Sequence, residues 1–233
     1  MSTPSMDSFF RTLNLKMEPQ LQSHMKNVYS CVALSTLSAA FGAFIHIFTG
    51  ILSGGFLSAI GSFGCMMALM STRDDGKNTT TRLGLLLGFA FLSGLGLGPL
   101  LEAVISVDPA IIPTAFFATC LIFTCFSLAS VFGDQRRFIY LGGTLMSLLS
   151  VLMIGGILNI FMGSYILFKA QIYIGLLVMC AFIVYDTQVI MEKRRMGEKD
   201  YIWHSICLFI DLIQVFRYLL VILTDKESNK KKK

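Results

Sequence analysis

Charged residues are scarce in this chain of 233 residues. They make up 14% of it, against roughly 25% in soluble globular proteins. Apolar residues make up 55%, and the mean hydropathy is +0.70. Because so few polar side chains cannot cover a surface that faces water, the composition excludes a soluble globular protein. Its high apolar content also excludes a disordered chain. The net charge of +5 lies in short loops and a tail, which indicates membrane topology and argues against nucleic acid as a partner.

The sequence also lacks the motifs of the common enzyme classes. It contains no G-x-S-x-G, P-loop, H-E-x-x-H or dinucleotide fingerprint. Its six cysteines all fall in apolar segments, without a C-x-x-C motif or a Cys/His cluster of zinc spacing. We therefore expect no enzymatic activity and no cofactor, and we interpret the cysteines as small apolar filler.

Long apolar runs are present instead. A run of about 20 residues can cross the hydrocarbon core of a bilayer as a helix. Seven such runs, none with strand alternation, cover residues 28–48, 51–71, 83–105, 111–132, 138–158, 172–191 and 201–223. We predict an all-α polytopic membrane protein with seven transmembrane helices. A cytoplasmic N-terminal segment (1–27) precedes the seven-helix domain (28–223), and a basic C-terminal tail (224–233) follows it.

The distribution of lysine and arginine predicts the orientation. The loops on the side of the N-terminus carry twelve of these residues, whereas the opposite loops carry only Lys169. Basic loops stay in the cytoplasm, so we place the N-terminus there. A full seventh crossing, which the length of 201–223 favours, puts the basic tail on the far side. If that segment dips in and returns, the tail is cytoplasmic and Lys230–Lys233 resembles a dilysine retrieval signal of the endoplasmic reticulum.

The third predicted span is rich in glycine. Gly84 and Gly88, and again Gly94 and Gly98, stand four residues apart, a spacing that lets helix backbones approach closely in a membrane. Pro99 removes a backbone donor near the end of the span and favours a kink. We expect a tightly packed helix.

Asp186 and Asp211 lie inside the sixth and seventh predicted spans. A carboxylate there costs on the order of 2.5 to 3.5 kcal/mol, so it needs a partner or a water-lined path. The loop 192–200 joins the two helices and puts the carboxylates roughly 8 Å and 15 Å below their cytoplasmic ends. If they face each other, they share one proton and titrate as a pair. We predict a pH sensor and gate; the alternative is a hydrogen bond that only holds two helices together.

The same two carboxylates offer oxygen ligands to a hard cation. Ca²⁺ takes roughly six to eight oxygens, so Asp186 and Asp211 with Thr187, Gln188 and backbone carbonyls make only a weak, transient calcium site. Weak binding is what conduction requires. On the side away from the cytoplasm, Glu102 and Asp108 are candidates for attracting cations to a pore mouth, with simple interfacial solvation as the alternative.

Two aspartates on consecutive membrane helices also resemble the presenilin-type intramembrane aspartyl proteases. Those proteases have Gly-x-Gly-Asp at the second aspartate, where this chain has Phe209-Ile210-Asp211. They also need a Pro-Ala-Leu motif on a later helix, which is absent here. Proteolysis is therefore a remote alternative.

Five segments carry a distinctive combination of residues. They are GFAFLSGLGLGP at 88–99, PTAF at 113–116, YDTQ at 185–188, DYIWH at 200–204 and LFID at 208–211. Together they closely resemble the endoplasmic reticulum branch of the transmembrane Bax inhibitor motif family, also called the Bax inhibitor-1-like family. The resemblance runs from about residue 20 to the lysine-rich tail.

This resemblance implies a fold in which six helices surround the last one. It implies a calcium leak from the reticulum lumen to the cytosol, suppression of cell death with effects on stress responses, and association with Bcl-2-type regulators and other reticulum membrane proteins. The proton-sensitive aspartate pair of the family falls on Asp186 and Asp211. A pure interaction protein, which restrains cell death by binding partners and leaks ions incidentally, is the alternative.

The chain departs from the family at two positions. Vertebrate relatives carry a further acid one turn before the second aspartate, where this chain has Cys207. Bacterial relatives latch the aspartate pair with an arginine at the cytoplasmic end of the second helix. In this chain that region offers only Arg73 as a candidate latch.

The orientation makes a prediction about glycosylation. Asn78-Thr79-Thr80 is the only acceptor sequon of the chain, and the charge distribution puts it in the cytoplasm, where the glycosylation machinery does not act. We expect no glycan on Asn78 when the protein is made in microsomes, measured as an unchanged gel mobility after glycosidase treatment. A glycan on Asn78 would reverse the orientation.

Overall fold

The chain folds into α-helices throughout the part that the structure describes. The computed structural model describes residues 18–49, 55–72, 76–133 and 141–231. The helices are α2 (Pro19–Thr49), α3 (Phe56–Ser71), α4 (Thr79–Val107), α5 (Ile111–Phe132), α6 (Gly142–Met162), α7 (Tyr165–Arg195) and α8 (Tyr201–Lys231). The prediction of an all-α protein is confirmed.

Within the described residues, six helices are long and apolar enough to cross a membrane: α2, α4, α5, α6, α7 and α8. Their outer surfaces are apolar as well. α6 buries only Gly142 and Leu145, and near its end Ile160 and Phe161 are 80% and 84% exposed. Such a surface is strongly unfavourable in water, but hydrocarbon accepts it. The protein is therefore a multi-pass membrane protein.

α3 is shorter than the expected second span. It has 16 residues and is about 24 Å long, against a hydrocarbon core of about 30 Å. It begins at Phe56 after Gly55, whose N–H donates to the Ser58 hydroxyl at 3.1 Å. The first part of the predicted run 51–71 lies outside the described residues, as does the start of 138–158, of which α6 covers the remainder.

Three helices extend past the boundaries predicted from hydropathy. α2 begins at Pro19 instead of residue 28, α7 begins at Tyr165 instead of residue 172, and α8 continues to Lys231 instead of ending at residue 223. Each has 31 residues and is about 47 Å long. Hydropathy locates the membrane and not the helix ends, because polar residues beyond the hydrocarbon still form intrahelical hydrogen bonds.

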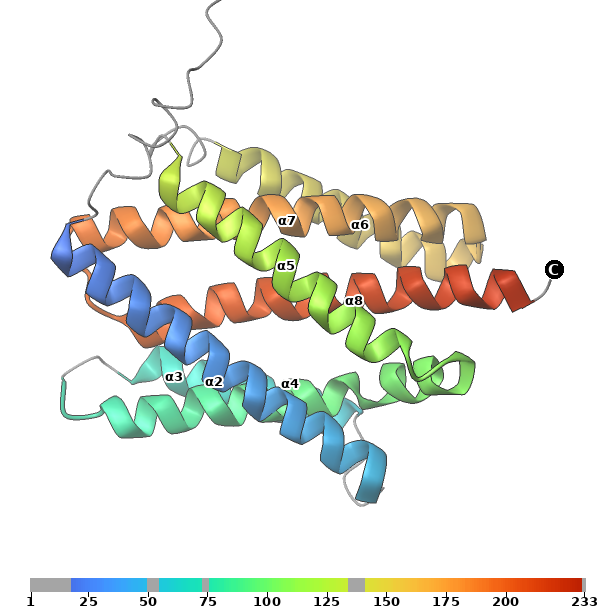
Figure 1. Ribbon diagram of the computed structural model, residues 1–233, viewed down its shortest axis with the longest axis horizontal. Coiled ribbons are helices and arrows are strands. Elements are labelled where there is room, and N and C mark those ends of the chain that lie inside the picture. The colour runs from blue at the N-terminus through green and yellow to red at the C-terminus, as the bar shows by residue number, and fades with distance from the viewer. Residues whose placement is uncertain (1–17, 50–54, 73–75, 134–140, 232–233) are drawn as a thin grey trace, which may run out of the picture.

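Two groups of helices meet at α8 (Figure 1). α7 and α8 form an antiparallel hairpin, with α6 packed on α7 and α5 across both, while α2 and α3 pack on α4. α8 packs against α2, α4, α5 and α7. It contributes buried side chains to all three apolar clusters, among them Leu208, Phe209 and Leu220. Residues on α8 therefore face both groups.

α2 and α4 cross at very short distance. A Cβ added to Gly94 of α4 would collide with the backbone of Ala39 on α2, and one added to Gly98 would collide with the ring of His46. By contrast, a Cβ at Gly84 would meet nothing within 4 Å, and one at Gly88 would make ordinary contact with Cys65. Close packing on α4 is thus concentrated at the second pair of glycines.

This crossing predicts the effect of two matched substitutions. Gly94→Ala drives a methyl group into the backbone of α2, so we expect the free energy of unfolding to fall by about 2 kcal/mol or more. Gly84→Ala has open space and gains helix propensity, so we expect no loss and a gain of up to about 1 kcal/mol. Thermal unfolding of the two variants in detergent, followed by circular dichroism, tests this prediction. Equal stability of the two variants would contradict a close contact between Gly94 and the backbone of α2.

Candidate functional site

The α7–α8 hairpin brings Asp186 and Asp211 together. Their carboxyl groups lie close enough for a hydrogen bond between them. Asp186 is half-buried, and Asp211 is 5% exposed. A hydrogen bond between two carboxyl groups needs a proton on one of them, so this geometry fits a pair that holds one shared proton.

Two other side chains lie close enough to act on this pair electrostatically. Cys207, one turn before Asp211 on α8, interacts with both carboxyls. Lys193, near the end of α7, interacts with Asp186 and also forms an ion pair with Glu198 at 3.6 Å. Arg73, the candidate latch, lies outside the described residues. Lys193 is therefore a cation that the described structure places near the pair.

Thr187 and Gln188 are buried but lie on other faces of α7. The Thr187 hydroxyl donates to the Ile183 carbonyl at 2.7 Å. One turn before Gln188, the Val184 carbonyl accepts a hydrogen bond from Ser130 of α5 at 2.8 Å. Among the described residues, neither the amide nitrogen nor the amide oxygen of Gln188 has a hydrogen-bond partner. Within this part of the chain, no hydrogen bond joins Gln188 to the carboxyl pair.

Glu102 and Asp108 lie at the opposite end of the bundle from the α7–α8 loop. Glu102 is exposed, and its carboxylate lies 3.2 Å from Nε2 of the buried His46. Asp108 accepts a hydrogen bond from the Ala110 N–H at 2.9 Å, and this stabilises the turn between α4 and α5. Each carboxylate therefore has a local structural role.

A buried ion pair joins α4 to the start of α8. Nη2 of Arg82 lies 2.5 Å from Oδ2 of Asp200, and the Arg82 side chain is 3% exposed. The other Asp200 oxygen accepts from the Trp203 N–H at 3.0 Å, as an N-cap does. In the sequence, Arg82 was only one of the basic residues in the loops on the side of the N-terminus. An aspartate directly before an apolar helix was the available signal for the cap, but no local pattern indicated its partner.

A histidine pair lies at the same end of the bundle. Nε2 of His24 on α2 is 3.0 Å from Nδ1 of His204 on α8, and both rings are buried. Nε2 of His204 also lies 3.4 Å from a carboxylate oxygen of Glu198. These contacts tie α2 to α8 and to the α7–α8 loop. No sequence motif indicated this pair, because the two histidines are 180 residues apart.

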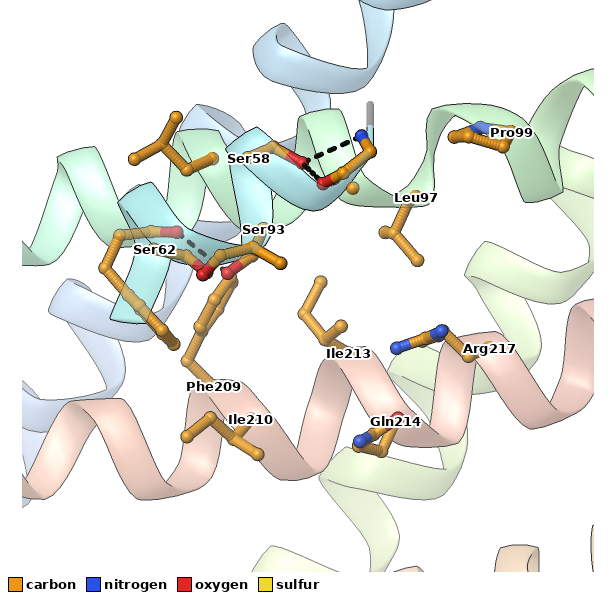
Figure 2. Close-up of a pocket in the computed structure, with 15 residues that line it drawn as sticks. Ser58, Ser62, Ser93, Leu97, Pro99, Phe209, Ile210, Ile213, Gln214 and Arg217 are labelled. Atoms are coloured by element: carbon orange, nitrogen blue, oxygen red, sulfur yellow. Dashed lines mark hydrogen bonds between the residues drawn. The ribbon is translucent and has the colours of Figure 1, made fainter. Parts of the chain in front are cut away.

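A cavity of about 450 Å³ lies beside the α7–α8 hairpin, where α3, α4 and α8 meet (Figure 2). Phe209 and Ile210, the residues before Asp211, line it, and Gln214 and Arg217 continue the same wall. Ser58 and its neighbours on α3 and α4 form the other walls.

The described residues contain no group of three or more His, Cys, Asp or Glu side chains that could hold a metal ion. The two carboxylates of the α7–α8 hairpin are too few for a lasting calcium site, which needs roughly six to eight oxygens. The geometry defines a polytopic helical membrane protein whose core brings two carboxyl groups together.

Comparison with known proteins assigns the family. A family model described as "Inhibitor of apoptosis-promoting Bax1" matches residues 21–228. The chain is 50% identical to Bax inhibitor 1 of Homo sapiens over 214 residues, covering 92% of this chain and 90% of the relative. It is 39% identical to Bax inhibitor 1 of Drosophila melanogaster, covering 96% and 91%. The chain belongs to the Bax inhibitor 1 family, and the resemblance seen in the sequence is confirmed.

The Arg82–Asp200 pair predicts a large effect of one aspartate. Asp200→Ala removes the cap of α8 and leaves the charge of Arg82 buried, so we expect the free energy of unfolding to fall by about 2 to 4 kcal/mol. Asp200→Asn keeps a cap and should lose less. The control is Asp225→Ala, which breaks a more exposed pair with Lys169 and should cost at most about 1 kcal/mol. Thermal unfolding measures all three, and equal losses for the two alanine variants would contradict the prediction.

Proposed function

We propose that this protein resides in the membrane of the endoplasmic reticulum, restrains Bax-dependent cell death and passes calcium passively from the lumen to the cytosol. Membership of the Bax inhibitor 1 family supports the role in cell death, since relatives that match at least nine-tenths of this chain carry that name. The buried carboxyl pair on α7 and α8 is the observation that carries the ion-conducting part.

In this proposal all seven helices cross the membrane, α8 lies at the centre, and the N-terminus is cytoplasmic. The basic end of α7, with Lys193, Arg194 and Arg195, supports the orientation, because such residues stay on the cytoplasmic side. The contacts of α8 with four other helices support its central place. The carboxyl pair then lies about 15 Å from the cytoplasmic end of α8, near the middle of the bilayer.

The proton on the carboxyl pair is the proposed gate. While Asp186 and Asp211 share it, their hydrogen bond holds α7 against α8. When the proton leaves, two negative charges face each other in a medium of low dielectric constant, and their repulsion changes the packing of the two helices. Cys207 and Lys193 are the neighbouring groups that modulate the pair. Flux is therefore coupled to pH through the helix interface.

Calcium is the transported ion and not a resident metal. Oδ2 of Asp211 is buried without a hydrogen-bond partner among the described residues, so it can accept a passing cation. Two carboxylates bind calcium weakly, as an ion that must leave again requires. Proteolysis is not part of this proposal, because the residues before Asp211 are Phe209 and Ile210 instead of the glycine-containing protease motif.

A pure interaction protein remains a second candidate function. α6 presents an apolar face with Val151, Ile154 and Ile157 all more than half exposed, and a membrane partner such as a Bcl-2-type regulator could cover such a face. The two candidates differ in what they need. A channel that lacks both aspartates loses its pH-dependent flux, whereas an interaction protein that lacks them keeps its partners and its protection against cell death.

The proton-sharing pair predicts a specific loss. Asp186→Asn and Asp211→Asn each keep hydrogen bonding but remove the repulsion between like charges, so each should abolish the pH dependence of calcium flux. Flux at a single pH can rise or fall, because the neutral pair fixes one helix packing. Calcium flux into proteoliposomes that contain the purified full chain, measured across pH, tests both variants.

Glu102→Gln is the matched control for this experiment. Glu102 is a membrane-end carboxylate remote from the α7–α8 loop, so its loss should at most scale the flux and leave the pH midpoint in place. A full pH response in Asp211→Asn would exclude the carboxyl pair as the sensor. The hydrogen bond would then serve only to hold α7 and α8 together.

A further inference from the structure

The cavity between α3, α4 and α8 is lined by the exposed cationic side chain of Arg217, in the second half of α8. Arg217 lies on α8 about 9 Å beyond Asp211 and about 12 Å before Asp225. Figure 2 shows its side chain extending from α8 into the space between Ile213 and Leu97 of α4. The structure places this exposed side chain on the cavity wall.

Arg217 has no anionic partner in the part of the protein that the structure describes. The ion pairs of the described residues use other cations, including Arg82, Lys169, Lys193 and Lys230. An unpaired guanidinium is unfavourable at membrane depth, where charged side chains pair with one another or face a polar cavity. An anion in the cavity would neutralise this charge and accept its N–H donors.

The remaining polar groups of the cavity complement a polar head group. The Ser58, Ser62 and Ser93 hydroxyls donate to carbonyls of their own helices at 2.8, 2.9 and 2.8 Å. Their oxygens remain acceptors, while Arg217 and the Gln214 amide supply donors. The cavity therefore presents a donor side on α8 and an acceptor side on α3 and α4.

The rest of the cavity is apolar and open to the bilayer. Leu92, Leu97 and Ile213 line its interior, and Ile210, on its edge, is 36% exposed. On the outside of α3, Phe56 and Leu57 are 84% and 80% exposed, as side chains in contact with hydrocarbon are. A ligand reaches this site from within the membrane, so it needs an apolar chain besides its acidic head.

We propose that this cavity binds an anionic amphiphile of the bilayer, with its acidic head group on Arg217 and its acyl chain along the apolar wall of α4 and α8. The head group is either the carboxylate of a fatty acid or the phosphate of an acidic phospholipid, since both present oxygens that a guanidinium binds in a bidentate manner. A volume of about 450 Å³ accommodates the head and part of one chain. This site is separate from the carboxyl pair and does not depend on ion conduction.

Photo-crosslinking of the purified full chain in neutral phosphatidylcholine nanodiscs tests the site. The probes are a diazirine-labelled palmitic acid, its methyl ester, and a diazirine-labelled phosphatidic acid, with the labelled peptides identified by mass spectrometry. We expect an acidic probe to label α3, α4 or α8 at the cavity, and the methyl ester to label it about tenfold less, as the loss of one charged hydrogen-bonded contact predicts. Labelling by palmitic acid alone identifies a carboxylate, and labelling by phosphatidic acid alone identifies a lipid phosphate.

Three variants make the result specific. Arg217→Gln should lose labelling about tenfold, and Arg217→Lys should retain part of it because the positive charge remains. Ala59→Trp keeps Arg217 but fills the cavity from α3, so it should also lose labelling. The control is Lys226→Gln, an exposed cation on the same helix, which should label as the unmodified protein does.

Equal labelling by the acid and its methyl ester, or undiminished labelling of Arg217→Gln, would overturn the proposal. Each variant is first compared with the unmodified protein by thermal unfolding. If the glutamine variant does not fold, Arg217→Lys and Ala59→Trp still test whether labelling depends on this cavity. Since crosslinking involves no calcium, failure of this site and failure of the proposed channel give different results.

Discussion

The absence of water in the hydrocarbon core is the constraint on which the rest of the structure depends. A polar group there is costly unless it finds a hydrogen-bond or charge partner. Serine and threonine hydroxyls meet this demand by donating to carbonyls of their own helices, as Thr36, Ser93 and Thr119 do at 2.7 to 2.8 Å. The stronger groups cannot be satisfied locally. Asp211 lies against Asp186, and Arg82 pairs with Asp200. For Arg217, the proposed partner is a ligand from outside the chain.

α8 carries most of these long-range contacts in order along its length. Asp200 caps its start, His204 follows, Asp211 lies about 10 Å beyond His204, and Arg217 lines the cavity beyond Asp211. Because α8 packs against both helix groups, these positions lie on a helix that contacts α2, α4 and α7. This arrangement gives the proposed proton gate a direct mechanical connection to the rest of the bundle.

Family membership and local geometry support different parts of the proposed function. The similarity to Bax inhibitor 1 of Homo sapiens and of Drosophila melanogaster covers more than nine-tenths of the chain, so it applies to the whole helical domain. The geometry adds what similarity alone does not contain. Cys207 lies beside the carboxyl pair, and Lys193 is a cation near that pair. Both features bear on how the proposed gate responds to protons in this particular chain.

The sequence by itself determined the all-helical membrane architecture, the approximate positions of the helices and the intramembrane aspartates, because hydropathy and charge act locally along the chain. It could not locate the helix ends, since helices such as α2 and α8 continue past the hydrocarbon. Only the tertiary structure decided which groups meet. Arg82 and Asp200 are 118 residues apart, and His24 and His204 are 180 apart. Of the glycines on α4, Gly94 lies in the helix crossing while Gly84 does not, although their spacings are alike. Such pairings depend on how helices cross in space, and no periodicity within a single helix encodes that.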